Sequence, residues 1–109
     1  MINTDLIKFD AAGLVPVVVQ DAKSAEVLMV AWANAEALKL TAEIGELVLW
    51  SRSRREIWHK GAVSGNKMKV AELRIDCDGD TVLAVVRPLG PACHTGERSC
   101  FYRTLFGKE

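Results

Sequence analysis

The sequence lacks an excess of charge of one sign, a long apolar run, an internal repeat and a linker. Its 14 basic and 14 acidic residues balance, which argues against general affinity for nucleic acid or an anionic membrane, because both favour a basic excess. No apolar run approaches the roughly 20 residues of a membrane span, and the polar start MINTDLIKFD is unlike a signal peptide. We therefore expect a cytoplasmic protein that binds neither nucleic acid nor membrane.

Cysteine is scarce and odd in number. The chain has only Cys77, Cys93 and Cys100. In the cytoplasm these thiols should be reduced, and three cysteines cannot all pair within one chain. Thiolates bound to a metal ion are therefore a serious option.

The apolar patterns predict a strand-rich α+β domain with one principal helix. The 109 residues, half of them hydrophobic, suit a single domain spanning 1–109. A helix is predicted over 34–45, between Asn34 as N-cap and Gly45 as C-terminal stop. Strands are predicted at 14–21, 26–33, 46–53, 55–60, 67–76, 81–88 and 100–106.

Three of these predictions go into finer detail. The run 26–33 is almost wholly apolar, which is typical of a strand buried on both faces. Asp78-Gly79 predicts a type I′ hairpin between two strands. In the helix, one face is expected to carry Ala35, Leu38 and Ala42.

Residues 76–80, DCDGD, hold three carboxylates, those of Asp76, Asp78 and Asp80. Aspartate and glycine are favoured at a hairpin tip, so one interpretation is a plain turn. The other is a site for a hard cation such as Mg²⁺ or Ca²⁺, which would relieve the repulsion among the carboxylates. The two interpretations can coexist, since a rigid hairpin is a good platform for ligands.

The cysteines also allow two interpretations. Cys93 and Cys100 flank HTGERS with a spacing that is not that of a zinc finger, so free, partly buried thiols are the plain alternative. Three thiolates would complete a zinc shell only with a fourth ligand. If that ligand is His59 or His94, the site is closed and structural; if it is water, the site is open and can activate that water.

The stretch 50–61, WSRSRREIWHKG, interleaves basic side chains with hydroxyls and tryptophans. It could be a solvated hairpin over buried tryptophans, or a phosphate site in which arginine forks and serine hydroxyls donate hydrogen bonds and aromatics stack on a base. Arg98 and Arg103 would add a second basic cluster. Two clusters in a neutral protein suit a small ligand with two phosphates. The candidate substrate-binding residues are Trp50, Ser51, Arg52, Ser53, Arg54 and Lys60.

Each histidine is by itself more typical of a surface or hydrogen-bonded residue than of a catalyst. His94 adjoins the candidate ligand Cys93, and a histidine beside a metal-bound water is a plausible proton carrier. His59 is the second, weaker candidate for a catalytic role.

Three motifs together resemble one enzyme family. WSRSRREIWHKGAVSGN, DCDGD and GPACHTGERSCFYR, in this order, resemble phosphoribosyl-AMP cyclohydrolase of histidine biosynthesis. The likeness runs from about EVLMVAWANAEAL to CFYR, with mild departures at Trp32 and Ala33, where a tyrosine and a bulkier apolar residue are expected. Because the chain ends soon after CFYR, the resemblance implies the monofunctional form.

The resemblance implies a homodimeric enzyme with active sites at the interface between its two copies. It implies Zn²⁺ on Cys77 of one copy and on Cys93 and Cys100 of the other, and Mg²⁺ on Asp76, Asp78 and Asp80. The reaction it implies is the zinc-dependent hydrolytic opening of the C6–N1 bond of 1-(5-phosphoribosyl)-AMP, the third step of histidine biosynthesis. That substrate carries a purine and two phosphates, as the two basic clusters and the aromatics suggest.

Two rival functions come from other classes. A zinc-stabilised binding module would hold a nucleotide unchanged. A deaminase would release ammonia, but the H-x-E and P-C-x-x-C pattern of zinc nucleobase deaminases does not occur in this sequence.

Overall fold

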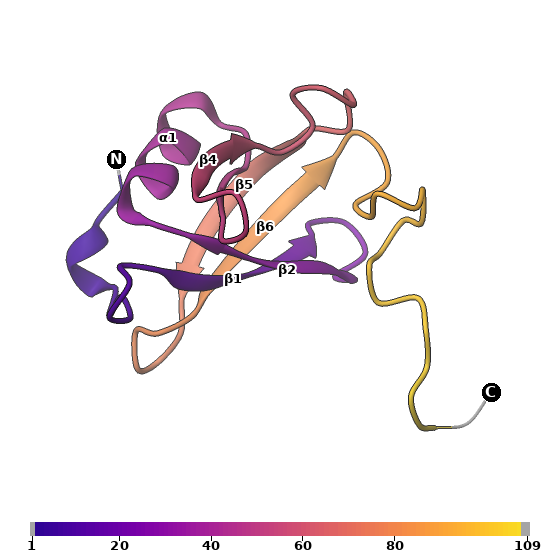
Figure 1. The fold of residues 1–109 in the computed structure, drawn as a ribbon. Helices are drawn as coiled ribbons and strands as arrows, with labels where there is room; N and C mark the ends of the chain where they lie inside the picture. The colour runs from indigo at the N-terminus through magenta and orange to yellow at the C-terminus, as the bar shows by residue number, and fades with distance from the viewer. Residues whose placement is uncertain (1, 108–109) are drawn as a thin grey trace.

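The computed structural model describes residues 2–107, which form a six-stranded mixed sheet and one α-helix (Figure 1). Its strands run in the order β4-β3-β2-β1-β6-β5. Neighbours are antiparallel except for β1 and β6, which run parallel. This confirms the predicted α+β class with one principal helix. The strands are β1 (Val15–Asp21), β2 (Val27–Ala33), β3 (Val48–Ser51), β4 (Glu56–His59), β5 (Met68–Ile75) and β6 (Val82–Pro88).

The helix α1 (Ala35–Ile44) begins and ends where its capping residues predict. The Asn34 side chain accepts a hydrogen bond from the Ala37 N–H at 2.8 Å, and Gly45 ends the helix in the left-handed region at φ 79°. A short 3₁₀ turn, η1 (Thr4–Leu6), precedes the sheet. The predicted limits of the helix are therefore confirmed.

The buried face of α1 differs from the predicted one. Leu38 is buried as expected, but the residues buried with it are Ala37 and Thr41, and Ala42 is exposed. Ala42 lies about 100° around the helix from Thr41. Alanine is tolerated on either face, so its spacing misled the prediction. The Thr41 hydroxyl is buried because it donates to the Ala37 carbonyl at 2.8 Å and accepts from the Val48 N–H at 2.9 Å, which ties the helix to β3.

The core lies on one face of the sheet, where α1 contacts β2 and β3. Alternate side chains of β1 and β6 are buried, as the period of two requires. The prediction that 26–33 is buried on both faces is wrong, because Val27 and Val30 of β2 are 41% and 49% exposed. A single helix covers only one face, so part of the apolar run stays on the surface.

Two turn and terminal predictions are also wrong. Asp78 does not have the positive φ that a type I′ turn requires; only Gly79 does, at 78°. Residues 100–106 form no strand but lead away from the body (Figure 1), with Leu105 and Phe106 almost fully exposed. Their apolar pattern suits a strand, but they have no partner strand along the described chain, and pairing is what makes a strand.

Among residues 2–107, no helix has the length and apolar character needed to cross a bilayer.

Candidate functional site

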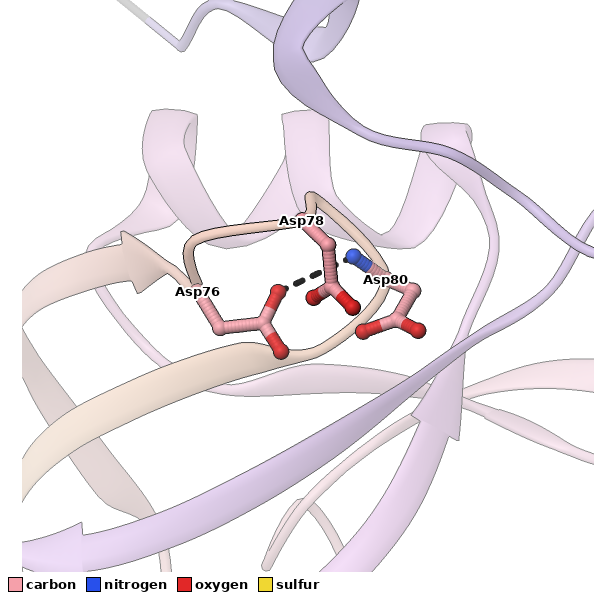
Figure 2. A group of neighbouring side chains, drawn as sticks. All are labelled: Asp76, Asp78 and Asp80. Atoms are coloured by element: carbon pink, nitrogen blue, oxygen red, sulfur yellow. Dashed lines mark hydrogen bonds between the residues drawn. The ribbon is translucent and has the colours of Figure 1, made fainter.

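The acidic turn (residues 76–81) joins β5 to β6 and gathers three carboxylates. Oxygens of Asp76, Asp78 and Asp80 all lie within 4.8 Å of one another, and Figure 2 shows the three groups on the same side of the turn. Asp76 shapes the turn, since its Oδ1 accepts hydrogen bonds from the N–H groups of Asp80 at 3.0 Å and Thr81 at 3.2 Å. The structure thus brings the three predicted Mg²⁺ ligands together.

The close approach of these carboxyl groups shifts the pKa values of Asp76 and Asp80 in opposite directions. Burial acts to raise the pKa of Asp76, but hydrogen bonds from the Asp80 side chain and from the N–H groups of Thr81 and Asp80 outweigh it, so the pKa falls. The pKa of Asp80 rises, because it shares hydrogen bonds with Asp78 and Asp76 and faces their charge. Metal–oxygen distances of about 2.0–2.6 Å allow one cation to bridge oxygens at this separation. The donor set therefore fits a hard cation.

The thiol loop (residues 91–100) follows β6 and carries Cys93, His94 and Cys100. Its two arms pair through hydrogen bonds from the Ala92 N–H to the Arg98 carbonyl and from the Cys93 N–H to the Glu97 carbonyl, both 3.1 Å. The Cys100 N–H donates to the Leu28 carbonyl of β2 at 2.7 Å. These hydrogen bonds make the side chains of Cys93 and Cys100 neighbours.

The two thiols interact and differ in acidity. The Thr95 hydroxyl donates to Cys93 Sγ at 3.0 Å and, with the Thr95 N–H, lowers the pKa of Cys93, to which Cys100 also contributes. Burial, and then the neighbouring Cys93, raises the pKa of Cys100. A thiolate beside a second thiol is the kind of donor pair that zinc takes, so this pair fits a zinc site with ligands still to be supplied.

Lys60 and the 61–66 loop, which end the motif at residues 50–66, lie against the thiol loop. Lys60 Nζ donates to the carbonyl of Ala92 at 2.8 Å, and its charge lowers the pKa of Cys100 against the effect of burial. A Cβ added at Gly90, directly before the thiol loop, would lie 2.2 Å from Asn66 Oδ1, so a larger residue there would require the Asn66 side chain to move. Of the candidate substrate-binding residues, Lys60 is therefore the one placed against the thiol pair.

The other candidate substrate-binding residues lie on the β3–β4 hairpin. Trp50 and Ser51 end β3, and Ser51 Oγ lies 3.4 Å from Ser53 Oγ and accepts from the Arg54 N–H at 3.2 Å. The guanidinium of Arg52 stacks over the ring of Trp32, 4.4 Å from its centroid. The hairpin thus presents an arginine and two hydroxyls, with the arginine stacked on Trp32 of the neighbouring strand β2.

The histidines have different surroundings. His94 is exposed in the thiol loop, next to Cys93. His59 Nε2 lies 2.8 Å from Glu46 Oε1, and Lys67 Nζ lies 3.9 Å from the same oxygen. His94 is thus free to face a ligand, whereas His59 is held by a carboxylate.

Arg98 contacts residues that the sequence did not link to it. It was expected to join Arg103 in a second phosphate cluster, but its guanidinium contacts the carboxylates of Asp21 and Glu26. A cation neutralised by two carboxylates is a poor phosphate ligand. Sequence reasoning missed Asp21, Glu26, Glu46 and Thr95, since nothing in the local pattern links them to the site.

Cys77 does not lie with the other two cysteines in one chain. It is exposed in the acidic turn, at the start of β6, whereas the thiol loop follows the end of β6 (Figure 1). Seven residues of strand separate the two ends by about 20 Å. Across residues 2–107, the three carboxylates are the one group of three or more metal-ligating side chains placed together.

Comparison with known proteins identifies the family. The family model for phosphoribosyl-AMP cyclohydrolase matches residues 29–102. The chain belongs to the phosphoribosyl-AMP cyclohydrolase family. The match includes all six predicted metal ligands and confirms the expectation of an enzyme of the hydrolase class.

Relatives of this family cover most of the chain. It is 54% identical over 103 residues to the phosphoribosyl-AMP cyclohydrolase of Archaeoglobus fulgidus, covering 94% of this chain and 95% of that protein. It is 57% identical over 98 residues to that of Azoarcus sp. strain BH72, covering 89% and 75%.

A longer relative carries an additional part. The chain is 53% identical over 107 residues to a histidine biosynthesis bifunctional protein of Halalkalibacterium halodurans, covering 98% of this chain and 51% of that protein. The chain thus corresponds to about half of the bifunctional relative.

Proposed function

We propose that this enzyme opens the adenine ring of 1-(5-phosphoribosyl)-AMP by hydrolysis of the C6–N1 bond, the third step of histidine biosynthesis, and that it requires zinc. The observation that carries the proposal is the Cys93–Cys100 pair in a loop of the matched family region. N1 substitution makes the purine cation-like and C6 electrophilic. Zinc, when bound, supplies Lewis-acid chemistry and lowers the pKa of a water molecule.

We place zinc on Cys93 and Cys100 of one copy and Cys77 of a second copy. The reason is distance, because β6 keeps Cys77 away from the other two thiols of its own chain. The thiols must stay reduced, as they would in the cytoplasm. Phe101, Tyr102, Leu105 and Phe106, all exposed on the segment after Cys100, give such a second copy an apolar surface to cover.

The remaining candidate residues have distinct tasks. His94, exposed beside Cys93, transfers the proton to or from the reacting ring, and His59 is the second candidate for this role. The β3–β4 hairpin binds a phosphate through Arg52, Arg54, Ser51 and Ser53 and stacks the purine near Trp50, while Lys60 holds the thiol loop in place. Asp76, Asp78 and Asp80 would hold Mg²⁺, which would supply positive charge to bind or orient a phosphate, or would order the interface between the two copies.

A mass-spectrometric assay tests the reaction. The protein is incubated with phosphoribosyl-AMP, Zn²⁺ and Mg²⁺, and again after chelation. We expect a product that is heavier than the substrate by one water, with no release of ammonia. This product should not form after chelation. Release of ammonia would indicate a deaminase, and an unchanged mass with zinc bound would indicate a binding module.

Mixing two inactive variants tests whether the zinc site is shared. We expect Cys77→Ser and Cys93→Ser each to be inactive alone. After the two are unfolded and refolded together, half of the dimers contain one of each variant, and each such dimer has one complete site. About a quarter of wild-type activity should return. Absence of any recovery, with mixed dimers verified by mass, would place the three thiols within one chain.

A further inference from the structure

Arg98 ties the thiol loop to the turn between β1 and β2. Its Nη2 donates to Asp21 Oδ2 at 2.5 Å and to Ser24 Oγ at 3.3 Å, and its Nε donates to Glu26 Oε1 at 2.6 Å. The fork of donors is thus filled by residues more than 70 positions away in the sequence. Two carboxylates on one guanidinium hold it in a single orientation.

Asp21 is built into the turn on its other side. Its side chain is only 7% exposed, and its Oδ1 accepts hydrogen bonds from the N–H groups of Lys23 at 2.7 Å and Ser24 at 3.2 Å. Both oxygens of the carboxylate are therefore engaged, one by the turn and one by Arg98. A buried anion fixed in this way gives Arg98 a rigid anchor.

The anchor acts on the two thiols because Arg98 belongs to the paired arms of the thiol loop. Its carbonyl accepts from the N–H of Ala92, directly before Cys93. Next along the chain, the Ser99 hydroxyl donates to the Val27 carbonyl at 2.8 Å, and the Cys100 N–H donates to Leu28. Displacing Arg98 would move both arms relative to β2, and with them the separation of Cys93 and Cys100.

We propose that Arg98 is a positioning residue for the zinc thiols, which acts by clamping the thiol loop to Asp21 and Glu26. This inference rests on the proposed zinc site. It assigns Arg98 to the metal rather than to a phosphate of the substrate. Groups that orient metal ligands commonly change metal affinity by about 10–100-fold when removed.

Zinc affinity and substrate affinity separate the two assignments. Asp21→Asn and Arg98→Gln are compared with the wild type for zinc binding against a competing chelator, and for KM and kcat at saturating zinc. For a clamp, both variants weaken zinc binding by about tenfold or more and leave KM within about twofold. Arg98→Lys, which keeps the charge but not the fork, should lie in between.

A phosphate ligand would behave differently. Arg98→Gln would then raise KM with zinc affinity unchanged, and Asp21→Asn would free the guanidinium and lower KM. Either result overturns the proposal. So does a purely structural effect, in which the metal-free variants unfold at a lower temperature while zinc affinity well below that temperature equals that of the wild type.

One control and two fallback variants keep the test decisive. Arg87→Gln removes an exposed arginine from β6 and should change neither zinc affinity nor KM. If Arg98→Gln does not fold, Glu26→Gln and Arg98→Lys are tested instead, because each retains part of the clamp. If both bind zinc as tightly as the wild type, the proposal is overturned. If the wild type itself neither binds zinc nor turns over substrate, the proposed function fails instead.

Discussion

The acidic turn and the thiol loop assemble their candidate ligands in different ways. In the acidic turn, three carboxylates two residues apart meet because a short turn folds back on itself and Asp76 accepts its backbone N–H groups. In the thiol loop, Cys93 and Cys100 meet only because bonds to β2, to Lys60 and to the β1–β2 turn hold the loop. Local sequence can therefore build a cation site, whereas a thiol pair seven residues apart needs the rest of the fold.

The largest expected effect is the loss of a thiol. Cys93→Ser should abolish zinc binding and lower turnover by about 10³-fold or more, since metal-derived stabilisation of several kcal/mol is removed. Zinc content by elemental analysis and turnover by the mass assay check this. Glu43→Gln, at an exposed position of α1, is the control for effects of the substitution procedure. An active, zinc-free Cys93→Ser protein would refute the zinc mechanism.

A smaller effect is expected from one carboxylate of the acidic turn. Asp78→Asn removes a ligand but no hydrogen bond to the turn backbone, so we expect magnesium affinity to fall by about tenfold with unchanged thermal stability of the metal-free protein. Asp76→Ala should weaken both magnesium affinity and thermal stability, because it removes the Oδ1 that accepts two backbone N–H groups. Titration with Mg²⁺ and thermal unfolding separate the two results. Equal stability loss in both variants would contradict the separate role of Asp76.

A third prediction concerns the anchoring of the acidic turn to the N-terminal segment. Gly65 and Gly79 both have positive φ, but a Cβ at Gly65 meets nothing within 4 Å, whereas one at Gly79 would lie 2.7 Å from the Leu6 carbonyl oxygen. Gly65→Ala should cost about 1–2 kcal/mol of unfolding free energy from backbone strain. Gly79→Ala should cost at least about 1 kcal/mol more, from the clash. Urea unfolding measures the free energy of unfolding of both variants. Equal losses would show that the contact with Leu6 does not contribute to the cost at Gly79.

The smallest expected effect is one of pH dependence at the anchor of the thiol loop. The Lys23 N–H first, then those of Ser24 and the Arg98 side chain, outweigh burial and lower the pKa of Asp21 below its usual value of 3.8. Its contribution to stability is therefore present above pH 3.8 and is lost as the pH falls through the lower, folded-state value. The difference in stability between wild type and Asp21→Asn should shrink as the pH falls below about 3.8. Urea unfolding over this range of pH checks it, and a constant difference would contradict the ionic role of Asp21.

Much of the fold follows from local patterns. The caps Asn34 and Gly45 set the limits of α1, and six of the predicted strands occur in the structure. The errors share a cause, since burial depends on what covers a segment. Val30 is apolar yet exposed because α1 covers one face only, and 100–106 remains outside the sheet along the described chain because no strand pairs with it.

The sequence by itself determined which chemical groups are present, their short-range spacing and the family to which the chain belongs. The three carboxylates of the acidic turn needed little more than a turn to meet, because they are close neighbours along the chain. Only the tertiary structure decided that Arg98 contacts Asp21, that Lys60 reaches the thiol loop and that Cys77 lies beyond the opposite end of β6. Such placements depend on strand order and on the length of a strand, and neither is encoded in the residues nearby.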